Sequence, residues 1–221
     1  ERLVRLFEQL ARSISGVPVD PNTSITIDVS GALVPDTQTP ITVVRIAPRK
    51  PVDSGHEMTP SPQLTLPIEV VHVAGGHSIL GTPLVSLQID ELSPVFKHPN
   101  PGLRYVISGV GSLMNSGHEQ AVGRLILERA DPASIDYAHQ FSSGAIAIRE
   151  RTALLNSSLL ENAASLSTTL GLVAAEWFPR ARLFVTTNDG GSAPVGRLAD
   201  SPVHSVYSGR ATELIGAAAI C

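Results

Sequence analysis

The sequence is poor in residues that cross-link or anchor a protein. It holds one cysteine, Cys221, in 221 residues, so no internal disulfide can form, which fits a reducing compartment. No apolar run reaches the roughly 18 residues that a membrane-spanning helix needs. We therefore expect a cytoplasmic protein that has no membrane as a partner.

Charge is also scarce. Charged residues make up 16% of the sequence and the net charge is −4, and lysine and arginine are scattered, so a nucleic-acid partner is disfavoured. An apolar fraction of 43% argues against disorder. The low charge density favours a surface covered by a partner subunit, a missing domain or a second copy of the chain.

What the sequence does contain is an alternation of strand and helix patterns. Apolar and β-branched runs predict strands, with a hairpin return at 78–80, over 24–34, 41–46, 68–73, 85–89, 105–114, 134–141, 182–187 and 204–206. Helical spacing predicts helices over 1–15, from Asn115 or Ser116 to Arg129, over 148–177, and from Ser208 to the end. Prolines predict a long loop over 48–67. The alternation indicates an α/β protein with a largely parallel or mixed sheet.

Both ends of the chain lie inside helical patterns without a cap. We therefore expect a piece of something longer, or one half of a larger assembly.

Four motifs in the last third of the chain occur in a recognisable order. Residues 183–191 read LFVTTNDGG, and Pro202-Val203, Ser208-Gly209 and Gly216-Ala217 follow. This order resembles the hydantoinase A/5-oxoprolinase family, in which an apolar strand and a glycine-ended turn precede a Pro-Val pair and a Ser-Gly turn that opens a Gly-Ala helix.

Upstream motifs extend the resemblance over residues 68–221. Glu150-Arg151-Thr152 before Leu155-Asn156 is similar to the family's Glu-Arg…Leu-Asn-Ala helix start. Asn115 with His118-Glu119 is similar to its Asn-Pro-x-His-Glu helix start, and Gly75-Gly76-His77 is similar to a Gly-Gly-His hairpin.

The resemblance implies an actin-like (ribonuclease H-like) mixed sheet with flanking helices, incomplete or truncated here. Residues 1–67 would be a remnant of the N-terminal hydantoinase/oxoprolinase domain with its proline-rich loop, and 68–221 an α/β segment leading into the hydantoinase A domain. The implied activity is ATP- and Mg-dependent hydrolysis, by ring opening, of a cyclic amide such as a hydantoin or 5-oxoproline. Cousins in the family carboxylate ketones.

The chain departs from the family at its phosphate-binding segments. The Asp-x-Gly-Gly-Thr-x-Thr-Asp loops are absent, a Thr-Thr…Asn segment is replaced by DVSGALV at 28–34, and Arg210 stands where the family has proline. These departures favour an alternative: a degenerate, non-catalytic relative that acts as a binding or scaffold module, or one recruited to ATP-independent chemistry.

The turn after the strand at 182–187 is the first candidate site. It lies at the carboxyl end of a buried strand, the edge where open α/β sheets bind ligands. With the resemblance, this predicts Asp189 and Asn188 as catalytic and Gly190 and Gly191 as cofactor-binding, since an aspartate can hold Mg²⁺-bound water and glycines admit a ligand to the backbone. The alternative is a plain turn.

A second candidate site opens the last helix. Ser208 and Gly209 are predicted to bind the cofactor because free N–H groups and a positive helix end attract anions. The alternative is an ordinary N-cap at Ser208. We expect the turn after Thr187 and the Ser208 corner to border one crevice.

The start of the long helix supplies the remaining candidates. The resemblance implies Glu150 as catalytic and Arg151 and Asn156 as substrate-binding. Alternatively, Glu150 only stabilises the helix start, and Asn156 is either a buried hydrogen-bonding group or a polar position on the outer face. No metal site is predicted, because the seven histidines lack His-x-x-x-His spacing and a cysteine partner. His118 is expected at the surface.

Overall fold

The computed structural model describes residues 5, 24–49, 66–97, 102–141 and 145–220. These residues form two compact units. The central unit is Asp36–Ser158, and the terminal unit combines Glu1–Pro35 with Leu159–Cys221. The helix predicted over 1–15 and most of the proline-rich loop lie outside the described residues.

The central unit contains a four-stranded sheet in which every neighbouring pair is parallel. Its order is β3-β2-β4-β5. The strands are β2 (Ile41–Ala47), β3 (Ile68–Ala74), β4 (Arg104–Gly109) and β5 (Ser134–Tyr137). The chain runs from β2 outward to β3 and then crosses back to β4, so the winding direction reverses between β2 and β4. In open parallel sheets, such a reversal opens a crevice at the carboxyl ends of the strands.

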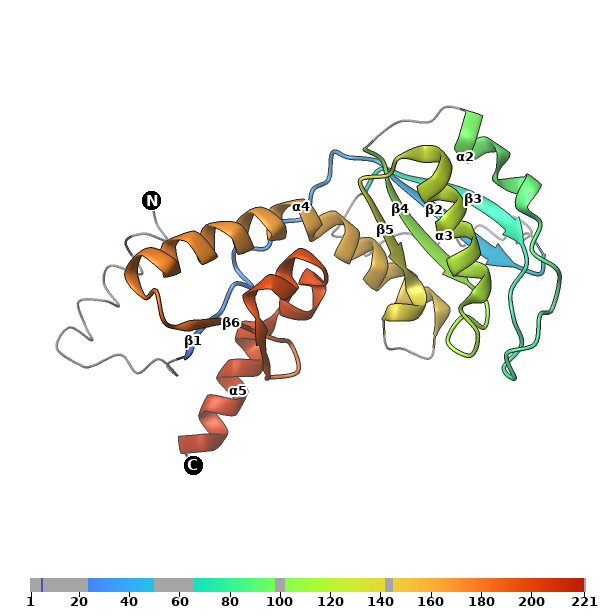
Figure 1. Ribbon diagram of the computed structural model, residues 1–221. Helices are drawn as coiled ribbons and strands as arrows, with labels where there is room; N and C mark the ends of the chain where they lie inside the picture. Colours follow the sequence, from blue (N-terminus) through green and yellow to red (C-terminus); the bar gives the residue numbers. More distant parts are fainter. Residues whose placement is uncertain (1–4, 6–23, 50–65, 98–101, 142–144, 221) are drawn as a thin grey trace. The chain divides into compact units, whose positions relative to one another are not determined.

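One face of this sheet is apolar. It packs against η1 (Ile89–Leu92), α2 (Ser93–Lys97) and α3 (Gly117–Ala130), which lie beside the sheet in Figure 1. The buried side chains of this core are Val44, Ile46, Val71, Val73, Leu92, Val95, Tyr105, Ile107, Val122, Ile126 and Ala130. Helices on a face of a parallel sheet are expected, because both faces of such sheets are normally covered.

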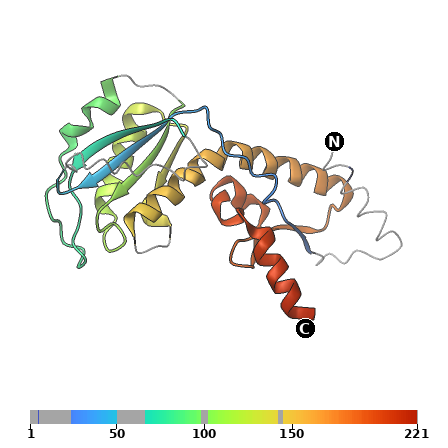
Figure 2. The same cartoon turned by 180° about the vertical axis from the view of Figure 1, so that it is seen from behind.

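The opposite face carries polar side chains in its middle. Arg45 of β2 stands in register with His72 of β3 and Ser108 of β4, and Asp136 of β5 points to the same side. The first turns of α4 (Ile146–Trp177) contact this face. Figure 2 shows the same unit from behind.

The terminal unit is built on a small mixed sheet in the order β1-β6-β7. β1 (Ser24–Ile27) is parallel to β6 (Arg182–Thr186), and β7 (Ser192–Pro194) is antiparallel to it. The second half of α4, η3 (Val195–Ala199), η4 (Pro202–Ser205) and α5 (Ser208–Ile220) complete the unit. Its core includes Val29, Leu170, Phe178, Val185 and Leu198.

Most predicted elements are confirmed, and the chain is a mixed α/β protein. Three local predictions are wrong. Residues 85–89 form no strand but lead into η1, 204–206 belong to η4, and 78–80 form a turn whose one bridge joins His77 to Pro83. β7 was not predicted.

The domain boundary predicted after residue 67 separates β2 from β3 in the sequence, although these two strands pair in one sheet. The assignment of residues 1–67 and 68–221 to family domains stays a prediction. In the described part of the chain, no helix is long and apolar enough to cross a membrane.

The turn after β4 supplies a test of backbone constraint. Gly111 has φ +69°, and a Cβ added there would lie 2.1 Å from the carbonyl oxygen of His77. We expect Gly111→Ala to lower the free energy of unfolding by about 3 kcal/mol or more, because backbone strain and a backbone clash add. Gly102→Ala is the matched control, since Gly102 has φ +90° but open space around it, and its loss should be about 1–2 kcal/mol. Urea denaturation of both variants measures the difference, and equal losses would contradict the clash.

Candidate functional site

The ends of three strands of the central sheet are hydrogen-bonded to one another, and two of them, β3 and β4, continue into glycine-rich loops. The amide of Gly75 donates to the carbonyl of Ala47 at 3.1 Å, and the amide of His77 donates to the carbonyl of Val110 at 2.8 Å. The amide of Val110 in turn donates to Ile46 at 2.9 Å. The carboxyl edge is therefore one connected surface of backbone, placed where parallel sheets bind ligands.

A buried carboxylate joins the ends of β4 and β5. Glu119 of α3 is fully buried, and its Oε1 accepts from the amide of Gly109 at 2.7 Å. Its Oε2 accepts from the amide of His139 at 3.2 Å and lies 2.5 Å from the Nδ1 of the same histidine. His139 belongs to η2 (Ala138–Gln140), directly after β5. Glu119 thus fixes the position of an imidazole at the carboxyl edge.

Two more histidines meet at this edge. The rings of His77 and His118 have centroids 4.1 Å apart, and the Nδ1 of His118 accepts from the amide of Gly76 at 2.9 Å. Burial, and next the neighbouring His77, lower the pKa of His118. His118 is therefore half-buried and bonded, so the prediction of a surface position is wrong. Within the described ranges, no group of three or more histidine, cysteine, aspartate or glutamate side chains could hold a metal ion.

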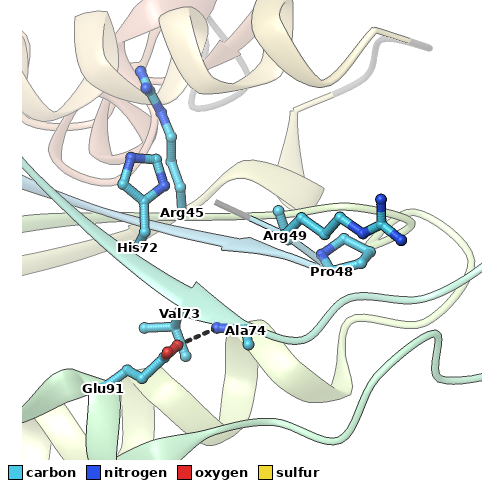
Figure 3. Close-up of a pocket in the computed structure, with 8 residues that line it drawn as sticks. Arg45, Pro48, Arg49, His72, Val73, Ala74 and Glu91 are labelled. Atoms are coloured by element: carbon cyan, nitrogen blue, oxygen red, sulfur yellow. Dashed lines mark hydrogen bonds between the residues drawn. The ribbon is translucent and has the colours of Figure 1, made fainter. Parts of the chain in front are cut away.

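A hollow of about 240 Å³ opens at the ends of β2 and β3. Arg45, Arg49, His72 and Glu91 line it. Figure 3 shows Arg45 and His72 pointing to the same side of the strands and Glu91 lying on the other side. The Glu91 carboxylate accepts from the amide of Ala74 at 2.6 Å, so it is occupied in holding the end of β3.

The predicted residues of α4 have different surroundings. Glu150 is buried and forms a bidentate ion pair with Arg45, with its Oε1 2.7 Å from one terminal nitrogen and both oxygens 3.0 Å from Nε. Asn156 is fully buried, and its amide donates to Asp136 at 2.8 Å. Burial raises the pKa of Asp136 to about 6, against the opposing effect of the Asn156 amide. Arg151 is exposed.

The turn at 188–191 in the terminal unit borders a second hollow. Asp189 Oδ1 accepts from the hydroxyl of Thr187 at 2.6 Å and from the amide of Gly191 at 3.0 Å, and these two bonds lower the pKa of Asp189. The hollow has a volume of about 260 Å³, and its lining includes Gly191 and the polar side chains of Asp189, Arg197, Ser201 and His204.

Asn188 and Gly190 of the same turn are engaged in contacts within the protein. The backbone amide of Asn188 donates to the carbonyl of His204 at 2.6 Å, and its side chain donates to the carbonyl of Val203 at 3.3 Å. Gly190 has φ +84°, and a Cβ added there would meet the Cδ1 of Ile215 at 2.1 Å. The close approach at Gly190 is therefore made by α5.

Ser208 lies beside the carboxylate of Asp28 rather than at the second hollow. Its hydroxyl donates to Asp28 Oδ1 at 2.7 Å and accepts from the hydroxyl of Thr186 at 2.8 Å. Burial alone would raise the pKa of Asp28, but hydrogen bonds from Ser30, Ser208 and Thr186 lower it below the usual value. A Cβ added at Gly209 would lie 2.8 Å from Asp28 Oδ2. Ser208 is fully buried and is not among the residues that line the hollow at Asp189.

The predicted site residues thus fall into separate groups. Asn188, Asp189, Gly190 and Gly191 share one turn of the terminal unit, and Ser208 and Gly209 adjoin Asp28 in that unit. Glu150, Arg151 and Asn156 belong to the central unit. Their roles stay predictions.

Sequence reasoning missed the Glu119–His139 pair and Asp28. The His-Glu motif at 118–119 was noticed but not joined to His139, and Asp28 directly follows a strand, which is a signal that could have been used.

Two solved structures resemble the chain in fold. One is an acetone carboxylase in a nucleotide-free structure from work on ATP-dependent acetone carboxylation, with a TM-score of 0.62, 16% identity, and coverage of 78% of this chain and 28% of that chain. The other is an ATP-dependent caprolactamase from Pseudomonas jessenii, with a TM-score of 0.58, 17% identity, and coverage of 95% and 33%. No family model and no curated protein matches the sequence.

At these identities the likeness shows the fold alone. The chain spans about a third or less of the length of either solved structure. The α/β architecture is therefore one that occurs in ATP-dependent enzymes.

The Arg45–Glu150 pair gives a test of how α4 is held. Glu150 is 2% exposed and Arg45 is 21% exposed. We expect Arg45→Gln to lower the free energy of unfolding by about 3 kcal/mol, because it leaves a buried carboxylate without its cation. The double variant Arg45→Gln/Glu150→Gln is the control, and it should lose less than the sum of the two single variants. Additive losses in urea denaturation would contradict a direct coupling.

Asp136 predicts a pH dependence of stability. Its folded pKa of about 6 exceeds the usual aspartate pKa of 3.8, so the folded state binds more protons between these values and stability falls as pH rises from about 4 through 6. Asp136→Asn removes this effect. The difference in unfolding free energy between variant and wild type should therefore grow by about 2.5 kcal/mol from pH 4 to pH 7.

Urea denaturation at several pH values measures the Asp136 difference. Glu128→Gln is the control, because Glu128 is exposed on α3. Carboxylates with a lowered pKa, such as Asp28 and Asp189, make the protein more stable as pH rises. They are present in both the variant and the wild type, so their contributions cancel in the difference. A difference that does not change with pH would contradict the buried, protonated state of Asp136.

Proposed function

We propose that the chain is part of an ATP-dependent enzyme of the hydantoinase/oxoprolinase type, with an actin-like fold, that opens a cyclic amide such as a hydantoin or 5-oxoproline. The observation that carries this proposal is the fold likeness to an ATP-dependent caprolactamase and to an acetone carboxylase. The motif order between residues 68 and 221 supports it independently, because that order is a property of the sequence alone.

The geometry of the central sheet supports the same class of function. Its carboxyl edge gathers glycine loops, an imidazole held by a buried carboxylate, and a hollow lined by two arginines. Glu150 of α4 is buried against the sheet and paired with Arg45, so in this proposal it acts through Arg45 rather than on the substrate. The exposed Arg151 is the predicted substrate-binding residue free to meet a substrate carboxylate, while Asn156 positions Asp136.

The terminal unit fits a Mg²⁺–nucleotide in part. Asp189 is exposed, keeps its charge, and is an oxygen donor of the kind that Mg²⁺ prefers. Asn188 and Gly191 shape the turn around it. The sequence contains no Asp-x-Gly-Gly-Thr loop, so we assign the triphosphate to no residue of this chain. Bound nucleotide would supply the phosphoryl group that activates an amide oxygen.

One observation favours the second candidate, a non-catalytic binding or scaffold module. At the start of α5, where a phosphate would be attracted, the Asp28 carboxylate already lies against Gly209 and Ser208. A relative that had lost nucleotide binding would tolerate an internal carboxylate at this place.

ADP release by the purified protein tests the two candidates. With Mg-ATP present, we expect 5-oxo-L-proline, hydantoin or ε-caprolactam to increase ADP release. Asp189→Asn should lower the increase by about a hundredfold, because the variant lacks the carboxylate proposed to hold Mg²⁺. Glu213→Gln, an exposed position on α5, is the matched control and should leave the rate unchanged.

Calorimetric titration with Mg-ATP accompanies the rate measurement. Heat of binding together with amide-dependent ADP release supports the enzyme. No binding heat, together with ADP release that no amide changes, would overturn it in favour of the binding or scaffold module.

A further inference from the structure

The neighbour of His139 selects one tautomer of its neutral imidazole. Its Nδ1 lies 2.5 Å from Oε2 of Glu119, a carboxylate that is fully buried. An ionised carboxylate only accepts hydrogen bonds, so Nδ1 carries the proton and donates it. In the neutral ring, the lone pair then resides on Nε2.

The other nitrogen is available. Among the described residues, no side chain or backbone group forms a hydrogen bond with Nε2 of His139. The side chain is 19% exposed, so the ring is partly covered but reachable. An imidazole oriented through Nδ1 by a carboxylate, with Nε2 free, is the arrangement by which enzymes present a general base.

A buried hydroxyl next to this pair also lacks a partner. Ser112 is 3% exposed, and its Oγ makes no hydrogen bond within the described part of the chain. Its Cβ and the Cγ of Glu119 lie 3.6 Å and 3.2 Å from the place where a Cβ on Gly109 would stand. Buried hydroxyls normally have a partner, so the Ser112 hydroxyl beside Glu119 is a polar group whose hydrogen-bonding capacity the described residues leave unused.

We infer that His139 is the proton-accepting catalytic residue at the carboxyl edge of the central sheet, with Glu119 as its positioning residue. This inference rests on the proposed function, and the substrate class is a cyclic amide with water as co-reactant. With the amide oxygen phosphorylated, Nε2 takes a proton from water as the water oxygen bonds to the amide carbon and the C=N electron pair moves to the ring nitrogen. The C–N bond then breaks as the new hydroxyl becomes the carbonyl and the ring nitrogen receives the proton from the imidazolium, whose charge Glu119 offsets. A second water molecule releases phosphate from the acyl phosphate that remains.

A purely structural role is the competing explanation, because Glu119 also accepts from the backbone of Gly109 and His139. Glu119→Gln separates the two. The glutamine oxygen can still accept from Gly109, but its NH₂ group then faces Nδ1 and the backbone N–H of His139, so it can donate to Nδ1 and no longer accepts from that backbone amide. The proton of the ring must then move to Nε2, which removes the base while the ring stays in place.

The tautomer is read by ¹⁵N NMR of the histidine side chains at pH 7.5, with His139→Gln used to assign the signal. We expect the Nδ1–H form in wild type and the Nε2–H form in Glu119→Gln. Glu128→Gln, on the same helix and exposed, is the control and should keep the wild-type tautomer. An Nε2–H form in wild type would overturn the inference and leave the proposed function standing.

Ring opening of 5-oxo-L-proline, hydantoin and ε-caprolactam with Mg-ATP supplies the second readout. Both His139→Gln and Glu119→Gln should lower kcat about a hundredfold or more with little change in KM, while Glu128→Gln keeps the wild-type rate. A wild type that opens an amide together with an equally active His139→Gln would overturn the inference alone. A wild type that opens none of the three would overturn the proposed function, and the inference with it.

If Glu119→Gln does not fold, the wild-type tautomer and the kinetics of His139→Gln still decide the question. The circular dichroism spectrum of each variant establishes which case applies.

Discussion

The ion pair between Arg45 and Glu150 is the interaction on which the central unit depends. A parallel sheet needs cover on both faces, and in this chain one cover is apolar while the other meets the sheet through charge. A buried ion pair adds little net stability compared with an apolar pair, but it is intolerant of a missing partner. It therefore fixes which residues of α4 face the sheet more strictly than apolar packing would. The Asp136–Asn156 bond extends the same polar layer to β5, two strands away from β2.

The carboxyl edge of the central unit depends on the apolar core of the sheet rather than on this polar layer. The apolar face holds α3 in place through Val122 and Ile126, and α3 in turn delivers Glu119 to the ends of β4 and β5. The carboxylate can be buried there because it receives hydrogen bonds from two backbone amides and an imidazole. The position of His139 is thus set by the apolar core between the sheet and α3, which places Glu119, and not only by the segment after β5.

The sequence predicted those helices and strands whose hydrophobic pattern lies within one continuous segment. Apolar, β-branched runs predicted β2, β3 and β4, because strands covered on both faces have little polar alternation, and periodicity predicted α3 and α4. It was insufficient for β7, which has three residues including a proline, and for η4, where a Pro-Val pair resembles a strand start.

Pairings between distant residues were the part of the candidate site that the sequence could not reveal. Asp28 and Ser208 are 180 positions apart, and Arg45 and Glu150 are 105 apart. No local pattern encodes such contacts. The motifs located the turn at Asp189 and the start of α5. They could not show that Ser208 would be buried and hydrogen-bonded to the carboxylate of Asp28.

Because the Asp28 carboxylate lies against Ser208 and Gly209, it competes with any outside anion for the start of α5. A helix start attracts anions, and a tethered carboxylate is present there at an effective concentration of roughly millimolar or above. Any free phosphate or carboxylate that approached Gly209 would have to displace it. Occupancy by an outside anion would then depend on whether β1 and its following residues stay docked, so the end of β1 regulates access to this corner.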